Sequence, residues 1–199
     1  MTDVVCDDEV GVPPVGRPRP DSYVIEAAHA GDANAWELLF RDLYPRLRPF
    51  IARRVPPDEI EDAVNETMAR AISGIGTAKL NTGSVDAWIF GIARNVAADS
   101  HRRAYRRNQR QAELAPSTFG GWGVTSPEES ALVRDDYWQM RVAFEHLRPD
   151  ERELLELRVV GELSVEETAR VLRKSPGAVR TAQSRALSRL RCLMEKCDV

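Results

Sequence analysis

The 199-residue sequence has no long hydrophobic run and no signal peptide pattern at its start. A membrane-spanning helix needs roughly 20 apolar residues in succession, and no stretch of the sequence approaches that length. The first residues are acidic and rich in proline, whereas a signal peptide begins with basic residues and continues with apolar ones. We therefore expect a cytoplasmic protein without membrane insertion.

Cysteine and histidine are also scarce, with three of each. Cys6, Cys192 and Cys197 form no CxxC pair and have no neighbouring histidine that would complete a zinc site, so we expect free thiols. The histidines are scattered, and the sequence contains no glycine-rich phosphate loop and no recognisable serine or cysteine nucleophile motif. These absences predict no metal, no cofactor and no catalytic residue, and favour a protein that is not an enzyme.

Charge is distributed very unevenly along the chain, although the net charge is only −3. Residues 58–66 contain five acids and no base. Residues 94–110 contain six arginines against the single acid Asp99, and residues 173–191 contain six bases and no acid. Each basic block could bind a polyanion such as nucleic acid, whereas the acidic block requires a different partner.

The hydrophobic periodicity predicts an all-α fold of two small helical domains, at 21–107 and 130–199. Residues 1–20 are too polar and proline-rich to form a core and predict a disordered tail. The glycines and prolines of 108–129 predict a flexible interdomain linker. Pro45 and Pro49 are expected to kink or split the second helix. The helices predicted in the first domain are 22–29, 34–55, 58–73 and 85–107.

The second domain carries the pattern of a helix-turn-helix. Ser164 and Glu167 form an S-x-x-E capping box that begins a short helix. After a brief turn, Ser175 can cap a longer helix whose first position is Pro176. In that helix the apolar residues predict a buried stripe, with Arg180 and its polar neighbours on the open face. Arginine can donate two hydrogen bonds to a guanine edge in the major groove.

The first domain combines an acidic and a basic helix. In the helix 58–73, Ile60, Val64, Met68 and Ile72 recur every four residues and are expected to face the core, which leaves the acids on the opposite side. Like charges at such spacings are mildly destabilising, so a basic protein partner would explain them. The helix 85–107 ends in arginines that can neutralise phosphates, while Trp88 is expected in the core.

Four segments of the sequence resemble the extracytoplasmic-function (ECF) group of sigma factors, which keep only regions 2 and 4 of the sigma-70 superfamily. The segment WIFGIARN at 88–95, followed by Asp99, Arg102 and Arg103, resembles the signature W-L-x-x-I-A-R-N-x-x-x-D-x-x-R-R. The segment DAVNETM at 62–68 resembles D-L-V-Q-E-T-F, and 147–153 and 163–169 resemble the start of region 4 and its first DNA-binding helix. The resemblance covers 21–107 and 130–191.

The resemblance implies an RNA polymerase sigma factor that directs promoter-specific initiation. Its partners would be core polymerase (the clamp helices of the largest subunit and the flap of the second largest), promoter DNA and an anti-sigma factor. For binding to core polymerase, the resemblance implies Glu59, Asp62, Asn65 and Glu66. For binding to the minus-10 element, it implies Asn81, Arg94, Asn95, Arg102, Arg103, Arg106 and Arg107. For binding to the minus-35 element, it implies Ser175, Pro176, Arg180, Thr181, Ser184 and Arg185.

The sequence departs from the family pattern at three positions. Asn65 and Met68 replace the usual glutamine and phenylalanine, and Arg173 stands where the helix-turn-helix turn usually has glycine. Three other interpretations stay open: a conventional regulator that binds operator DNA as a dimer, a protein that only sequesters a partner, and an enzyme. DNA binding without polymerase would indicate a conventional regulator. Function that does not depend on Arg180 would indicate a protein that sequesters a partner, and nucleotide hydrolysis would indicate an enzyme.

Overall fold

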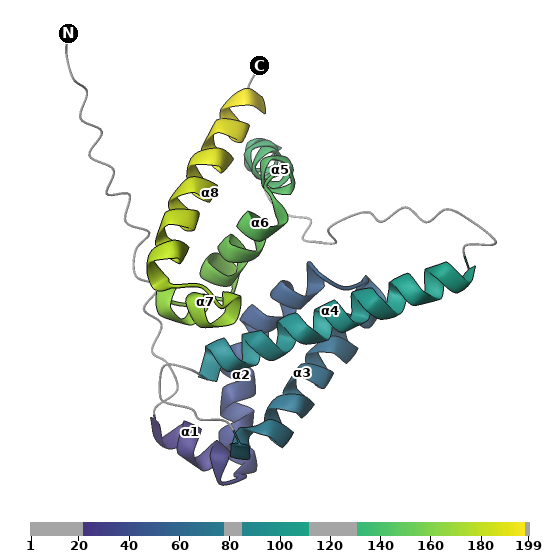
Figure 1. The fold of residues 1–199 in the computed structure, drawn as a ribbon, viewed down its shortest axis with the longest axis vertical. Coiled ribbons are helices and arrows are strands. Elements are labelled where there is room, and N and C mark those ends of the chain that lie inside the picture. Colours follow the sequence, from purple (N-terminus) through teal and green to yellow (C-terminus); the bar gives the residue numbers. More distant parts are fainter. Residues whose placement is uncertain (1–21, 78–84, 112–130, 198–199) are drawn as a thin grey trace.

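The computed structural model describes residues 22–77, 85–111 and 131–197, and this part of the chain consists of helices joined by short turns (Figure 1). It contains no β-strand within those ranges, so the predicted all-α fold class is confirmed. No helix in the described ranges has both the length and the apolar character needed to cross a membrane. The α-helices are α1 (Ser22–His29), α2 (Ala33–Ala52), α3 (Ile60–Gly74), α4 (Val85–Gln111), α5 (Ala131–Glu145), α6 (Pro149–Leu155), α7 (Val165–Leu172) and α8 (Pro176–Cys197).

Three short helical turns complete the fold: η1 (Pro57–Glu59), η2 (Ile75–Thr77) and a π-helical turn, η3 (Glu156–Val160). The predicted tail 1–20, Asn81 and most of the predicted linker 108–129 lie outside the described residues. The first four residues of that predicted linker belong to the last turn of α4.

The first domain packs α1 to α4 around one apolar core (Figure 1). Leu43 and Phe50 of α2, Val64 of α3 and Phe90 of α4 are fully buried there. The rings of Phe50 and Phe90 meet edge to face, with their centroids 5.2 Å apart. This geometry is favourable for aromatic pairs, and the contact joins α2 to α4.

Helix α2 continues without interruption through Pro45 and Pro49, so the predicted split does not occur. Each proline removes one backbone hydrogen bond and costs about 3 kcal/mol in a helix interior. Leu43, Leu47 and Phe50 lie on the buried face of the same helix and are fully enclosed. Burial of such side chains contributes about 1.5–3 kcal/mol each, which is enough to hold the helix together.

The predicted core stripe of α3 is correct at its centre and wrong at its end. Val64 and Met68 are buried, but Ile72 is 51% exposed and Ala71 takes the buried position beside it. An α-helix has 3.6 residues per turn, so side chains spaced by four drift steadily around the axis. By Ile72 the stripe has rotated away from the core.

The second domain packs α5, α6 and α7 against the long helix α8 (Figure 1). Its small core contains Leu147, Leu154, Leu155, Val179 and Ala186. Helices α5 and α6 therefore support the helix-turn-helix of α7 and α8 by packing against α8.

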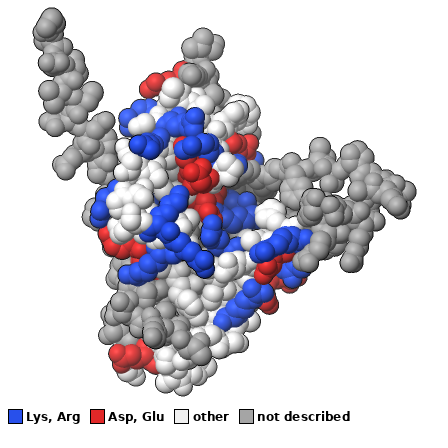
Figure 2. Space-filling model, viewed as in Figure 1, with Lys and Arg blue, Asp and Glu red and all other residues white. Residues whose placement is uncertain are grey.

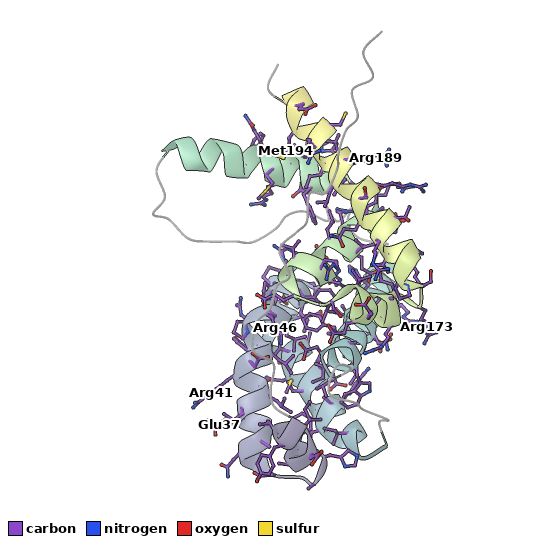
Figure 3. All side chains as sticks on the ribbon, turned by 90° about the vertical axis from the view of Figure 1, so that its left-hand side faces the viewer. Glu37, Arg41, Arg46, Arg173, Arg189 and Met194 are labelled. Atoms are coloured by element: carbon purple, nitrogen blue, oxygen red, sulfur yellow. The ribbon has the colours of Figure 1, made fainter. Side chains whose placement is uncertain are left out.

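The two domains pack directly against each other, which the sequence did not predict. Leu157, Leu163 and Val171 of the second domain are buried in the core of the first. Arg46 of α2 donates a hydrogen bond of 3.1 Å to the carbonyl oxygen of Gly161, and Figure 3 shows it toward the end of α2 that meets the second domain. The junction consists mainly of η3 packed on α2 and of α7 packed on α4.

Candidate nucleic-acid interface

The turn between α7 and α8 has the geometry of a helix-turn-helix. The Ser164 hydroxyl accepts a hydrogen bond from the Glu167 amide at 3.2 Å, and the Glu167 carboxylate accepts one from the Ser164 amide at 2.8 Å. The Ser175 hydroxyl accepts a hydrogen bond from the Ala178 amide at 3.2 Å. Both predicted caps therefore form, and they fix where each helix begins.

Arg173 ends α7 in the left-handed conformation, with φ of +53°. This conformation closes the turn, because it lets the Lys174 amide donate to the carbonyl of Ala169 at 2.9 Å. Glycine adopts it without steric cost, whereas other residues are strained there. Arg173 therefore adopts the conformation that glycine favours, and Figure 3 shows it at this edge of the domain.

The outward face of α8 presents the side chains that the sequence predicted. Arg180, Thr181, Ser184 and Arg185 are all exposed, as are Ser175 and Pro176 at the beginning of the helix. Val179 and Ala186 are fully buried on the opposite face. Arg180 lies 3.1 Å from the carboxylate of Glu166, an exposed ion pair of the kind that contributes little to stability. This arginine can therefore exchange its partner for DNA.

The predicted minus-10 residues lie on α4 or just before it. Asn95, Arg102 and Arg103 are exposed, and Arg102 also pairs with Asp99 at 3.1 Å. Figure 2 shows basic side chains gathered on the second domain and along α4, with acidic ones between them. Asn81 lies outside the described residues, and of Arg106 and Arg107 the structure describes only the helical backbone. Arg94 points toward the second domain, as described below.

The predicted polymerase-binding residues Glu59, Asp62, Asn65 and Glu66, called here the acidic edge, follow η1 and the outer face of α3. Asp62, Asn65 and Glu66 are exposed, whereas Glu59 accepts a hydrogen bond from the Ser100 hydroxyl. The acids line a shallow depression that Ser100 and Arg103 of α4 close from the other side. The structure therefore brings the acidic edge together and places it beside the basic helix.

The beginning of α6 holds an electrostatic network that joins it to α8. The buried Glu151 carboxylate accepts hydrogen bonds from the amide of Arg148 at 3.1 Å and from its guanidinium at 2.7 Å, and Arg189 of α8 lies 3.4 Å away. Burial acts to raise the pKa of Glu151, but the hydrogen bonds and charge of Arg148, with Arg189, outweigh it and hold that pKa below its usual value.

The sequence analysis did not predict the ion pairs at the domain junction, although it named Arg94 for the minus-10 element. Glu153 and Glu156 of the second domain pair with Arg94, Arg53 and Arg54 of the first. Burial raises the pKa of Glu156, an effect that Arg54 and Arg53 oppose. These partners lie far apart in the sequence, so no local spacing or periodicity could have identified them.

Two protein families match this sequence. Residues 39–107 match Sigma-70 region 2, and residues 137–190 match Sigma-70, region 4. The first match contains α3, most of α4 and the acidic edge, and the second contains α7 and most of α8. The matches therefore cover the surfaces that the charge pattern and the geometry single out.

Curated relatives match over most of the chain. The ECF RNA polymerase sigma factor SigD of Mycobacterium tuberculosis is 36% identical over 182 residues, which cover 87% of this chain and 82% of SigD. The ECF RNA polymerase sigma factor ShbA of Streptomyces griseus is 34% identical, over 87% of this chain and 94% of ShbA.

Solved structures agree in fold. The sigma factor RpoE, in complex with the anti-sigma factor NepR from Bartonella quintana, superposes with a TM-score of 0.60 at 22% identity, over 80% of this chain and 96% of that one. CnrH, in complex with the cytosolic domain of CnrY, superposes with a TM-score of 0.58 at 20% identity, over 87% of this chain and 96% of that one. Fold, sequence and surface chemistry agree, and the chain belongs to the ECF group of RNA polymerase sigma factors, which recognise promoters.

Proposed function

We propose that this sigma factor uses its two domains for separate recognition steps, with residues 21–107 acting as region 2, 108–129 as the linker and 130–199 as region 4. Region 2 would bind the clamp helices of the largest polymerase subunit and open the minus-10 element. Region 4 would bind the flap of the second-largest subunit and read the minus-35 element. This proposal rests on the exposed face of α8, whose side chains belong to neither apolar core.

The minus-35 assignment rests on the side chains that α8 presents. Arg180 and Arg185 can each donate paired hydrogen bonds to a guanine, and the hydroxyls of Thr181 and Ser184 can reach bases or phosphates. Ser175 and Pro176 set the beginning of the helix close to the phosphate backbone, where the helix dipole favours negative charge.

The minus-10 assignment rests on the arginines of α4. Arg102 and Arg103 would neutralise phosphates, with Arg106 and Arg107 one turn further along the same helix. Arg94 and Asn95 lie about two turns before Arg102 and Arg103. Asn81, from the segment that precedes α4, would contact an unstacked base. Each phosphate contact releases counterions, so binding would weaken as salt increases.

The acidic edge has the opposite charge and needs a basic protein surface. Asp62 and Glu66 are exposed and aligned on one side of α3, and Asn65 between them can donate and accept hydrogen bonds. We assign this surface to the polymerase clamp helices.

An anti-sigma factor is the partner that we expect to control this chain, since RpoE and CnrH were solved with proteins bound to them. The proposed place of action is the cytoplasm, where polymerase and DNA meet. We assign the chain no catalytic step, because polymerase performs the chemistry of transcription.

In vitro transcription tests this function. The purified chain would be added to core polymerase from Mycobacterium tuberculosis or Streptomyces griseus and to a library of promoter fragments. We expect specific start sites that require the chain, and sequence preferences at two separated elements. A sharp footprint on DNA by the chain alone, with neither core binding nor initiation, would instead support a conventional regulator.

A further inference from the structure

The strongest feature that the proposed roles do not explain is the set of ion pairs at the domain junction. The Glu153 carboxylate accepts two hydrogen bonds from the Arg94 guanidinium, at 2.7 Å from Nε and 3.2 Å from Nη2. Glu156 pairs with Arg54, and its Oε1 lies 4.0 Å from Nε of Arg53. We call Glu153 and Glu156 the junction carboxylates and Arg53, Arg54 and Arg94 the junction arginines.

The junction arginines all belong to the first domain, and the acids facing them belong to the second. Arg53 and Arg54 follow the last turn of α2, and Arg94 lies in α4, one residue before Asn95 of the proposed minus-10 surface. Without the second domain, the first domain would present three arginines in a group that continues the basic surface of α4. Clustered arginines of this kind bind phosphates well, because each guanidinium offers a planar fork of donors.

The contact is closely packed rather than a loose charge pair. The Glu156 side chain is 7% exposed and that of Arg54 is 14% exposed, and the Arg54 guanidinium lies 3.7 Å from the centre of the Phe50 ring. Leu157, which follows Glu156, is fully buried in the core of the first domain. Removing one member of a buried ion pair leaves a charge without compensation and is strongly destabilising.

The packed arrangement is nevertheless too compact for both promoter elements. Elements at minus-10 and minus-35 lie about 25 base pairs apart, which is about 85 Å of duplex at 3.4 Å per base pair. A compact chain of this length has a radius of gyration of only about 16 Å. The two domains must therefore separate, and they are joined covalently only through the segment between α4 and α5.

We propose that the junction arginines are a binding surface for promoter DNA phosphates, occupied in the free protein by the chain's own junction carboxylates. The carboxylates take the place of the phosphate oxygens and keep region 4 folded back on region 2. When the domains separate on the promoter, the three arginines exchange carboxylates for phosphodiester groups. This inference adds Arg53 and Arg54 to the DNA surface and rests on the function proposed above.

The first test measures closure without polymerase or DNA. The variant Glu153→Gln/Glu156→Gln removes both negative charges and keeps the size of the side chains. We expect a larger radius of gyration by small-angle X-ray scattering, with helicity unchanged by circular dichroism. The matched control is Glu37→Gln, which breaks the exposed pair with Arg41 at 2.8 Å on another part of α2. A double variant as compact as the parent would overturn the proposed closure.

The second test measures phosphate binding directly, with a short fluorescent single-stranded DNA of mixed sequence. We expect the open variant Glu153→Gln/Glu156→Gln to bind this probe more tightly than the parent does. Adding Arg53→Gln/Arg54→Gln should reduce the slope of log K against log salt by about 1.4, since each phosphate contact on a single strand contributes about 0.7. Arg53→Lys/Arg54→Lys should keep the slope, because it keeps both charges.

Arg41→Gln in the same open background is the control for loss of an exposed arginine elsewhere. A slope that does not change with Arg53→Gln/Arg54→Gln would refute the phosphate surface. Both tests omit polymerase, so they can succeed or fail independently of the transcription assay.

Discussion

At the scale of single residues, Arg173 is the clearest case of local strain, because a left-handed φ of +53° costs a non-glycine residue about 1 kcal/mol. We expect Arg173→Gly to raise the free energy of unfolding by about 1 kcal/mol, measured by urea denaturation. The control is Arg170→Gly inside α7, where glycine should lower stability by about the same amount. Loss of stability in Arg173→Gly would mean that the arginine side chain makes a compensating contact.

Arg180 and Arg185 decide whether α8 reads bases or only holds the DNA backbone. If each contacts a base, Arg180→Ala or Arg185→Ala should cost about 1–3 kcal/mol on the preferred minus-35 sequence and relax the preference at one position. The measurement is holoenzyme binding to a library randomised at that element. Arg191→Ala, near the end of the same helix, is the control. Equal weakening on all sequences would assign the two arginines to phosphate contacts.

At the scale of elements, the acidic edge of α3 should bind polymerase through charge. Asp62→Lys/Glu66→Lys reverses two exposed charges, and we expect core binding measured by biolayer interferometry to be lost. Glu66 pairs with Arg70 at 2.7 Å on the surface, and such exposed pairs contribute at most about 1 kcal/mol, so the fold should survive. Glu37→Lys is the control for a reversed charge elsewhere on the domain. Binding that persists in the double variant would remove the acidic edge from the interface.

The beginning of α6 should make the stability of the protein depend on acid pH. The pKa of Glu151 is held below its ordinary value of 4.5, so its contribution is present above pH 4.5 and is lost as the pH falls through the folded-state value. Glu151→Gln should therefore be less stable than the parent at pH 7, and the difference should shrink below pH 4.5. Thermal unfolding of both proteins from pH 7 to below pH 4.5 measures this difference in stability.

Glu156 contributes with the opposite sign, because burial raises its pKa above 4.5. Protonation of Glu156 stabilises the folded state as the pH falls, and it does so in both proteins. The difference in stability between the parent and Glu151→Gln therefore isolates the contribution of Glu151. A difference that does not change with pH would contradict the role assigned to this carboxylate.

At the scale of the whole molecule, Gly161 shows how closely the two domains approach. A Cβ atom at this position would lie 2.8 Å from the carbonyl oxygen of Leu157 and 3.0 Å from the Phe90 ring. We expect Gly161→Ala to cost about 1–3 kcal/mol, as overpacking typically does, and to enlarge the radius of gyration. Gly91→Ala is the control, since a Cβ there meets no atom within 4 Å. A compact and stable Gly161→Ala protein would mean that the junction can adjust.

Sequence reasoning predicted the local features of this protein well. The capping box at Ser164, the cap at Ser175 and the exposed Arg180 face depend on residues within one or two helical turns, and the structure confirms them. Of the kink or split predicted at Pro45 and Pro49, the split does not occur, because packing across the first domain outweighs the local effect of proline. The predicted burial of Ile72 was wrong, because a spacing of four residues drifts around a helix of 3.6 residues per turn.

The sequence by itself determined the helical class, the charge blocks and the family, because each depends on neighbouring residues or on motifs in their order along the chain. Only the tertiary structure decided that the domains are packed together and that Glu153 and Glu156 meet Arg94, Arg53 and Arg54. The physical reason is that ion pairs and core contacts between distant segments depend on distance in space, which no periodicity along the chain encodes.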